Sequence, residues 1–115
     1  MALNKGDIVL VRFPFSNLSQ TKLRPALVLA VSRIIDEITL CFISSQNLQN
    51  LTYDEFAITT SDNEFTLTGL KTNSKVRVTK IITLEQKLII RKIGSLGKRH
   101  TKILNQTLIT AFNLG

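Results

Sequence analysis

Residues 6–30 read GDIVLVRFPFSNLSQTKLRPALVLA. The stretch contains two β-branched and aromatic runs, Ile8–Phe13 and Ala26–Val31, which predict two strands. A proline follows the first run and predicts its end, because proline has no N–H for a sheet ladder. The polar residues between the runs predict a loop that closes at Arg24, where Pro25 restricts the backbone. The stretch therefore predicts a strand–loop–strand unit that holds one arginine beside a rigid element.

Further strands are predicted downstream of this unit. Apolar runs indicate strands at Ile38–Ile43, around Phe56–Ile58 within a longer segment, at Ser74–Leu84 and at Lys87–Ile93. Thr68-Gly69 indicates a turn. We see no internal repeat or linker in the sequence, so one domain is expected over residues 1–115, with strands at about 7–93.

The last part of the chain has a different period. From Lys98 to Asn113 the apolar side chains recur at helical spacing, with Gly97 as a candidate cap. These side chains are Ile103, Leu104, Leu108, Ile109 and Phe112. A helix is therefore expected at about 97–113. Five or six short strands followed by one helix predict a mainly β domain, built as a small antiparallel barrel.

Length and composition restrict the class of protein. The chain has 115 residues, 43% of them hydrophobic, which is typical of one globular domain with its own core. No apolar run approaches the roughly 18 to 20 residues that a membrane span needs, and no hydrophobic segment of a signal peptide precedes the first strand. The single Cys41 lies in an apolar run and is expected to be a buried thiol. We expect a cytoplasmic protein without a membrane association.

The net charge of +7 is unevenly distributed. Four acidic residues cluster in the middle of the chain, and ten Lys or Arg residues lie between Lys71 and Lys102 with only Glu85 opposing them. The acidic residues are Asp54, Glu55, Asp62 and Glu64. This asymmetry favours an anionic partner, either nucleic acid or a very acidic protein segment. The alternative is an ordinary solvated surface.

Several kinds of catalytic site are absent from the sequence. His100 is the only histidine, lies in a run of basic residues and is expected to be a solvated surface group. No His, Cys or carboxylate cluster has the spacing of metal ligands, so we expect no metal. There is also no glycine-rich phosphate loop and no serine elbow, and we expect no cofactor.

The residues that remain for chemistry are arginines and hydroxyls. Arg24 has the planar, permanently charged fork that suits a phosphate or a phosphorane transition state. A structural alternative is that Arg24 pairs with Asp36 or Glu37. Ser44 and Ser45 end the third predicted strand, where a hydroxyl can reach the same site, although serines at strand ends are common.

Arg77 and Thr79 share one face of their predicted strand, because side chains in a strand alternate with a period of two. Val76 and Val78 then face the core, and the face that carries Arg77 is either exposed or lines a groove.

These motifs resemble the MazF/PemK family, the toxins of type II toxin–antitoxin pairs. Residues 6–30 are similar to the N-terminal signature of the family, and ISSQ at Ile43–Gln46 is similar to its strand-end motif. SKVRVTKIITL at Ser74–Leu84 and IRKIGSL at Ile90–Leu96 resemble the following segments in the same order. The resemblance spans almost the whole chain.

The resemblance implies an SH3-like barrel of the MazF/PemK/CcdB type that acts as a homodimer. It implies a metal-independent, sequence-selective endoribonuclease that cleaves single-stranded RNA, such as mRNA, by attack of the 2′-hydroxyl, and that an acidic antitoxin neutralises. Arg24 takes the place of the transition-state arginine, Ser44 that of the catalytic Thr or Ser, and Arg77 that of an arginine at the cleavage site. The residues expected to bind RNA are Lys22, Ser45, Gln46, Thr79 and Lys80.

The chain departs from the family pattern at three places. Thr79 replaces an Asp, Ile82 replaces a frequent arginine, and the loop Phe15–Lys22 has no carboxylate. The general base is therefore not identified. Two alternatives follow: a relative that binds RNA or an antitoxin without cleaving, and a gyrase-poisoning toxin of similar architecture.

Overall fold

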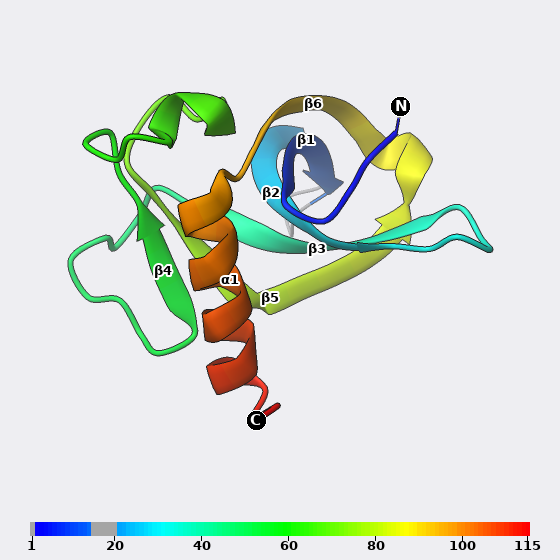
Figure 1. Ribbon diagram of the computed structural model, residues 1–115. Coiled ribbons are helices and arrows are strands. Elements are labelled where there is room, and N and C mark those ends of the chain that lie inside the picture. The colour runs from blue at the N-terminus through cyan, green and yellow to red at the C-terminus, as the bar shows by residue number, and fades with distance from the viewer. Residues whose placement is uncertain (1, 15–20) are drawn as a thin grey trace.

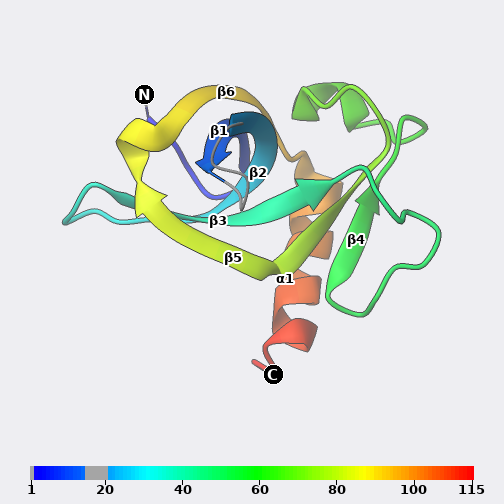
Figure 2. The same cartoon turned by 180° about the vertical axis from the view of Figure 1, so that it is seen from behind.

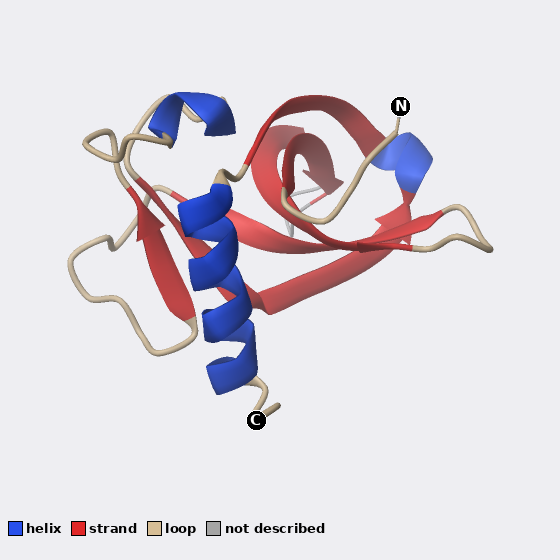
Figure 3. Ribbon diagram, in the orientation of Figure 1, coloured by secondary structure: helices blue, strands red, loops and turns tan. Residues whose placement is uncertain are grey.

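A computed structural model describes residues 2–14 and 21–115. The strands are β1 (Asp7–Pro14), β2 (Thr21–Val31), β3 (Glu37–Ser44), β4 (Glu55–Ile58), β5 (Ser74–Glu85) and β6 (Ile89–Ser95). The helix α1 (Lys98–Ala111) follows them, and two 3₁₀ turns, η1 (Phe65–Thr68) and η2 (Gln86–Leu88), lie between strands (Figure 3). No helix in this described part is long and apolar enough to cross a membrane.

The strands form one antiparallel sheet in the order β4-β5-β3-β2-β1-β6. The sheet curls strongly, so that β1, β2 and β6 wrap around one another, while α1 lies beside β4 and in front of β5 (Figure 1). From behind, β3 and β5 run across the molecule as its longest pair (Figure 2). The predicted class, mainly β with a C-terminal helix, is confirmed.

Two hydrophobic clusters lie on opposite faces of the curled sheet. Val9, Val28 and Leu40 belong to the first cluster, which also receives Ile82 and Leu84 from the second half of β5. Leu27, Cys41 and Val76 belong to the second cluster, which packs under α1. Because β3 has a core on both faces, its residues form the nearly continuous apolar run that the sequence shows.

The helix buries only part of its predicted apolar stripe. Leu104 is fully buried, and Ile103 and Leu108 pack against the second cluster. Ile109 and Phe112 are 47% and 43% exposed, because they lie on the last turns, which extend past the sheet (Figure 1). The predicted helix is confirmed at its start, and it ends at Ala111, two residues before the predicted end at Asn113.

Two strand boundaries differ from the prediction. β2 begins at Thr21, so Pro25 lies inside the strand, opposite Leu10 of β1. The ladder between β2 and β3 begins only at Ala26, so at Pro25 the strand β2 is paired with β1 alone. One side of the backbone is unpaired there, as in an edge strand, and proline is tolerated at such a position. The last strand begins at Ile89, because residues 86–88 form η2.

Two glycines allow the η1 turn to touch β6. Gly69 ends η1 with a φ of 71°, in the left-handed region that favours glycine. A Cβ atom on Gly69 would lie 2.0 Å from the carbonyl oxygen of Ile93, and one on Gly94 would lie 2.3 Å from the carbonyl carbon of Thr68. The two backbones are therefore in direct contact, and this contact fixes the segment that follows Gly69.

Candidate functional site

Arg24 and Ser44 lie beyond the same end of the ladder that joins β2 and β3. Arg24 pairs with Val11 of β1, and Ser44 is the last residue of β3. The ladder between β2 and β3 begins with the pair Ala26 and Phe42. Continuing this antiparallel register by two residues would place Arg24 opposite Ser44 on the same face.

Both residues line a pocket with a volume of about 830 Å³. Five of the eight residues predicted to act on RNA line it: Lys22, Arg24, Ser44, Ser45 and Gln46. The opposite wall is the segment Gly69–Thr72 together with Ser74, Arg91 and Ile93. The pocket thus joins the strand–loop–strand unit at the N-terminus to β5 and β6, which are distant in the sequence.

The charge of the pocket is strongly positive. Its four charged side chains are Lys22, Arg24, Lys71 and Arg91, and no Asp or Glu is among the described residues that line it. Between the charges lie apolar side chains such as Leu10, and hydroxyls such as that of Thr72. Cations with hydroxyl donors around an apolar floor suit a ligand that carries both phosphates and bases.

The structure does not support the alternative role of Arg24 as a partner of Asp36 or Glu37. Val31 pairs with Ile38, so Glu37 lies beside the far end of β2. At about 3.3 Å per residue, the seven residues between Arg24 and Val31 correspond to roughly 20 Å. The two carboxylates are therefore out of reach of Arg24.

Sequence reasoning missed Lys71 and Arg91 as pocket residues. Arg91 pairs with Leu10, so the antiparallel ladder between β1 and β6 brings it next to the first strand. Lys71 follows the turn at Gly69 that contacts β6. The surplus of cations after Phe65 was the only signal for these two residues, and it did not distinguish them from the other lysines and arginines.

Arg77, Thr79 and Lys80 do not line this pocket. Arg77 is partly exposed, with 39% of its side chain accessible, and its Nε donates to Glu55 Oε2 at 3.0 Å. Thr79 and Lys80 lie on the exposed part of β5 beyond Arg77. The structure thus groups five of the predicted residues and places these three along the neighbouring strand.

A buried carboxylate, that of Glu55, organises the region around Arg77. Only 5% of its side chain is exposed, and Oε1 accepts from Lys75 Nζ at 3.1 Å and from the Thr52 N–H at 3.2 Å. Burial alone would raise the pKa of the Glu55 carboxyl, but the Thr52 N–H and the ammonium of Lys75 outweigh burial and lower it below its usual value. Glu55 is therefore ionised and serves as the counterion of Lys75 and Arg77.

A second carboxylate, that of Asp54, lies beside Thr79. It accepts hydrogen bonds from the hydroxyls of Thr52 and Thr79, and these bonds lower the pKa of the Asp54 carboxyl. A carboxylate is therefore present next to the position at which the family pattern has an Asp. Because a lowered pKa makes a weaker base, the arrangement does not identify Asp54 as a general base at neutral pH.

The expectation that His100 is a solvated surface group is wrong. Its side chain is fully buried, with Nε2 3.0 Å from Asp62 Oδ2 and Nδ1 3.8 Å from Glu64 Oε1. The Glu64 carboxylate also accepts from the backbone N–H groups of Arg99 and His100, at the start of α1. The imidazole fills the junction between the segment 59–68 and the helix, where Nε2 forms a hydrogen bond with Asp62 and Nδ1 has no hydrogen-bond partner among the described residues.

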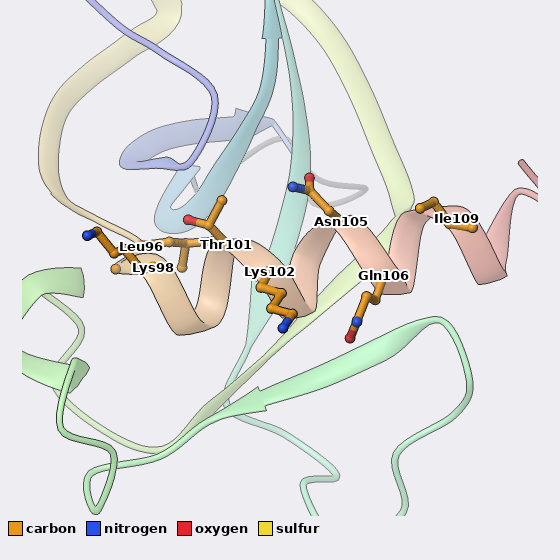
Figure 4. A pocket seen from close by; sticks show the side chains of 8 residues that line it. Leu96, Lys98, Thr101, Lys102, Asn105, Gln106 and Ile109 are labelled. Atoms are coloured by element: carbon orange, nitrogen blue, oxygen red, sulfur yellow. The ribbon is translucent and has the colours of Figure 1, made fainter. Parts of the chain in front are cut away.

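A shallower hollow of about 470 Å³ lies along α1, next to this junction. Thr101, Lys102, Asn105 and Gln106 line it, and their side chains spread over the helix surface without converging (Figure 4). Among residues 2–14 and 21–115, no group of three His, Cys, Asp or Glu side chains is arranged to hold a metal ion. In the predicted loop without a carboxylate, Phe15–Lys22, residues 15–20 lie outside the described residues, and Thr21 and Lys22 belong to β2.

Comparison with known proteins identifies the family of the chain and solved structures with a similar fold. Residues 4–112 match the family described as PemK-like, MazF-like toxin of type II toxin-antitoxin system. An endoribonuclease from a mycobacterial species, solved in complex with its cognate antitoxin, superposes with a TM-score of 0.75 at 16% identity, covering 99% of this chain and 98% of that one. The Mycobacterium tuberculosis toxin MazF-mt6 gives a TM-score of 0.71 at 19% identity, covering 93% and 96%. None of the curated proteins compared matches the chain.

Proposed function

Because the chain belongs to the PemK-like, MazF-like toxin family of type II toxin–antitoxin systems, we propose that it is an endoribonuclease that cleaves single-stranded RNA at selected sequences without a metal ion. The observation that carries the proposal is the pocket that Arg24 and Ser44 line together with three further cationic side chains, those of Lys22, Lys71 and Arg91. Cationic groups preorganised around a phosphate are what a phosphoryl-transfer transition state requires.

The reaction uses a nucleophile that RNA itself carries. The 2′-hydroxyl oxygen bonds to the adjacent phosphorus while the bond from phosphorus to the 5′-oxygen breaks, which leaves a 2′,3′-cyclic phosphate and a 5′-hydroxyl. Arg24 stabilises the negative charge of the phosphorane, and Ser44 donates to one of its oxygens. The 2′-hydroxyl gives its proton to a solvent water, and the departing 5′-oxygen takes a proton from solvent, so the step is balanced in protons. Arg77 is proposed to assist that oxygen, although this requires RNA to reach past the pocket along β5.

The strand of RNA is held by the remaining residues. Lys22, Lys71 and Arg91 provide phosphate contacts around the pocket, while Ser45 and Gln46 face the bases. Thr79 and Lys80 are proposed to contact the part of the strand that lies along β5. Each phosphate contact with single-stranded RNA contributes about −0.7 to the slope of log affinity against log salt, so affinity falls steeply as salt rises.

The same pocket explains how an acidic antitoxin inhibits. A carboxylate-rich peptide fits the cations that bind phosphates, so occupation of the pocket by such a segment excludes RNA. One of the superposed endoribonucleases is solved with its cognate antitoxin. For this chain we propose a cognate acidic antitoxin, a homodimer and a cytoplasmic location. A small acidic protein encoded next to this chain, whose co-expression relieves toxicity, is the expected observation.

The test is cleavage of labelled single-stranded RNA in EDTA by the wild type, Arg24→Ala and Arg33→Ala. Arg33 is an exposed arginine in the turn between β2 and β3, so its variant loses the same charge far from the pocket. Wild type and Arg33→Ala should yield cyclic phosphate ends. Arg24→Ala should cleave about 10²- to 10³-fold more slowly. Undiminished cleavage by Arg24→Ala, or binding without products by the wild type, would contradict the proposal.

A further inference from the structure

Lys75 is a buried lysine next to the candidate catalytic serine. It pairs with Ser44 across β3 and β5, and only 8% of its side chain is exposed. Lysine is rarely buried unless it is paired, because its ammonium group is strongly hydrated. A buried lysine beside the site therefore needs a structural reason.

The ammonium group of Lys75 bridges two parts of the structure. Nζ lies 3.1 Å from Glu55 Oε1 in β4 and 3.2 Å from the carbonyl oxygen of Asn47. Asn47 has a φ of 54°, so the chain turns there in the left-handed region. The bond to its carbonyl therefore fixes the backbone three residues after Ser44.

The short segment between Ser44 and Asn47 forms one wall of the pocket. The hydroxyl of Ser44 accepts the Gln46 N–H at 3.0 Å, which is the local contact that holds the turn. Lys75 adds a contact from outside the turn, through the Asn47 carbonyl. Glu55 also accepts the Thr52 N–H, so the same ion pair holds the loop near both of its ends.

We infer that Lys75 is a positioning residue, which holds Ser44–Gln46 at the distance from Arg24 that RNA cleavage requires. This inference rests on the proposed ribonuclease function. Lys75 does not line the pocket and its ammonium is engaged by Glu55 and Asn47, so it acts through Ser44 without touching RNA. A displacement of about 1 Å in a catalytic group can reduce a rate by about 10².

The choice of variant follows from the ion pair. Glu55→Gln would leave a buried ammonium without its carboxylate, which is strongly destabilising. Lys75→Met retains the apolar stem, and Glu55 remains paired with Arg77 and with the Thr52 N–H. Lys75→Met therefore removes the bond to Asn47 with less damage to the fold. Lys87→Met is the matched control, because Lys87 is 71% exposed and forms its ion pair with the exposed Glu85.

Two measurements test the inference. Backbone order parameters from NMR should fall for Gln46 and Asn47 in Lys75→Met, from about 0.85 towards 0.6, and stay unchanged in Lys87→Met. In RNA cleavage, Lys75→Met should lower kcat by about 10- to 100-fold with little change in KM. Should Lys75→Met fail to fold, Lys75→Gln replaces it, because its shorter amide cannot reach both Glu55 and Asn47.

The outcomes separate the two proposals. If the wild type does not cleave RNA, the proposed function fails while the order parameters still test the role of Lys75. Unchanged order parameters in the folded variant would overturn the inference. So would a raised KM with an unchanged kcat, because that result would make Lys75 a contact for RNA.

Discussion

At the start of α1, Glu64 makes hydrogen bonds whose contribution to stability can be estimated from the structure. The carboxylate of Glu64 accepts the N–H groups of Arg99 and His100 at 3.1 to 3.3 Å, although Glu64 lies more than thirty residues earlier in the chain. The first N–H groups of a helix have no partner within the helix. Glu64 thus serves as the cap that Gly97, at the N-cap position, cannot supply from a side chain.

We therefore expect Glu64→Ala to destabilise the fold. Loss of a helix cap costs about 1.5 kcal/mol, and loss of a negative charge at the helix N-terminus costs about 0.5 kcal/mol more. The unfolding entropy of about 2.1 cal/mol/K per residue gives roughly 0.24 kcal/mol/K for 115 residues. A loss of about 2 kcal/mol then lowers the Tm by about 8 °C.

The assay is urea denaturation at pH 7, together with thermal unfolding. Glu64→Gln retains an oxygen acceptor and should lose about 0.5 kcal/mol, the contribution of the charge. Glu85→Ala is the control for an exposed carboxylate and should change the free energy of unfolding by less than about 0.5 kcal/mol. A loss in Glu64→Ala no larger than that of Glu85→Ala would refute the capping role.

A substitution at Gly97 tests the contact between Glu64 and the helix start independently. A Cβ atom on Gly97 would lie 2.4 Å from Glu64 Cδ, so Gly97→Ala must displace the carboxylate. We expect Gly97→Ala to destabilise the protein and to add little to Glu64→Ala in the double variant, since both changes remove one interaction. Fully additive losses would show that the glycine acts in another way.

Two further predictions concern titratable groups. The Thr59 N–H and then His100 lower the pKa of the Asp62 carboxyl below 3.8, so its contribution to stability is present above that pH and is lost as the pH falls through the folded-state pKa. Asp62→Asn should be less stable than wild type at pH 7, and the difference in denaturation free energy should narrow below about pH 4; a constant difference would contradict this. Burial raises the pKa of the Cys41 thiol to about 12, so iodoacetamide should leave Cys41 unmodified at pH 8 and alkylate it in urea, as mass spectrometry would show. Rapid alkylation of the folded protein would contradict the buried position.

Much of the fold follows from patterns that are local in the sequence. The β-branched run of β1, the two-residue period of β5 and the helical spacing around Leu104 each specify their own element. Pro25 was misplaced because its tolerance inside β2 depends on where the ladder to β3 begins. That register is a property of two strands, and neither strand alone specifies it.

Only part of the candidate site could be predicted, because the rest depends on how distant strands pair. Arg24 and Ser44 come from motifs, and the structure places both in the lining of one pocket. Arg91 enters the pocket through the pairing of β6 with β1, and Lys71 through the contact of the Gly69 turn with β6; local patterns contain neither. His100 was misjudged because its run of basic residues does not show that the ring is buried against acidic side chains from a distant segment. Its acidic partners, Asp62 among them, lie over thirty residues away.

The contact between η1 and β6 also has an evolutionary consequence. Gly69 and Gly94 are 25 positions apart, and each excludes a side chain because of backbone next to the other. A mutation at either glycine cannot be compensated by a smaller residue at its partner, since the partner already has none. Neither position can therefore accept a residue with a side chain while this backbone contact exists.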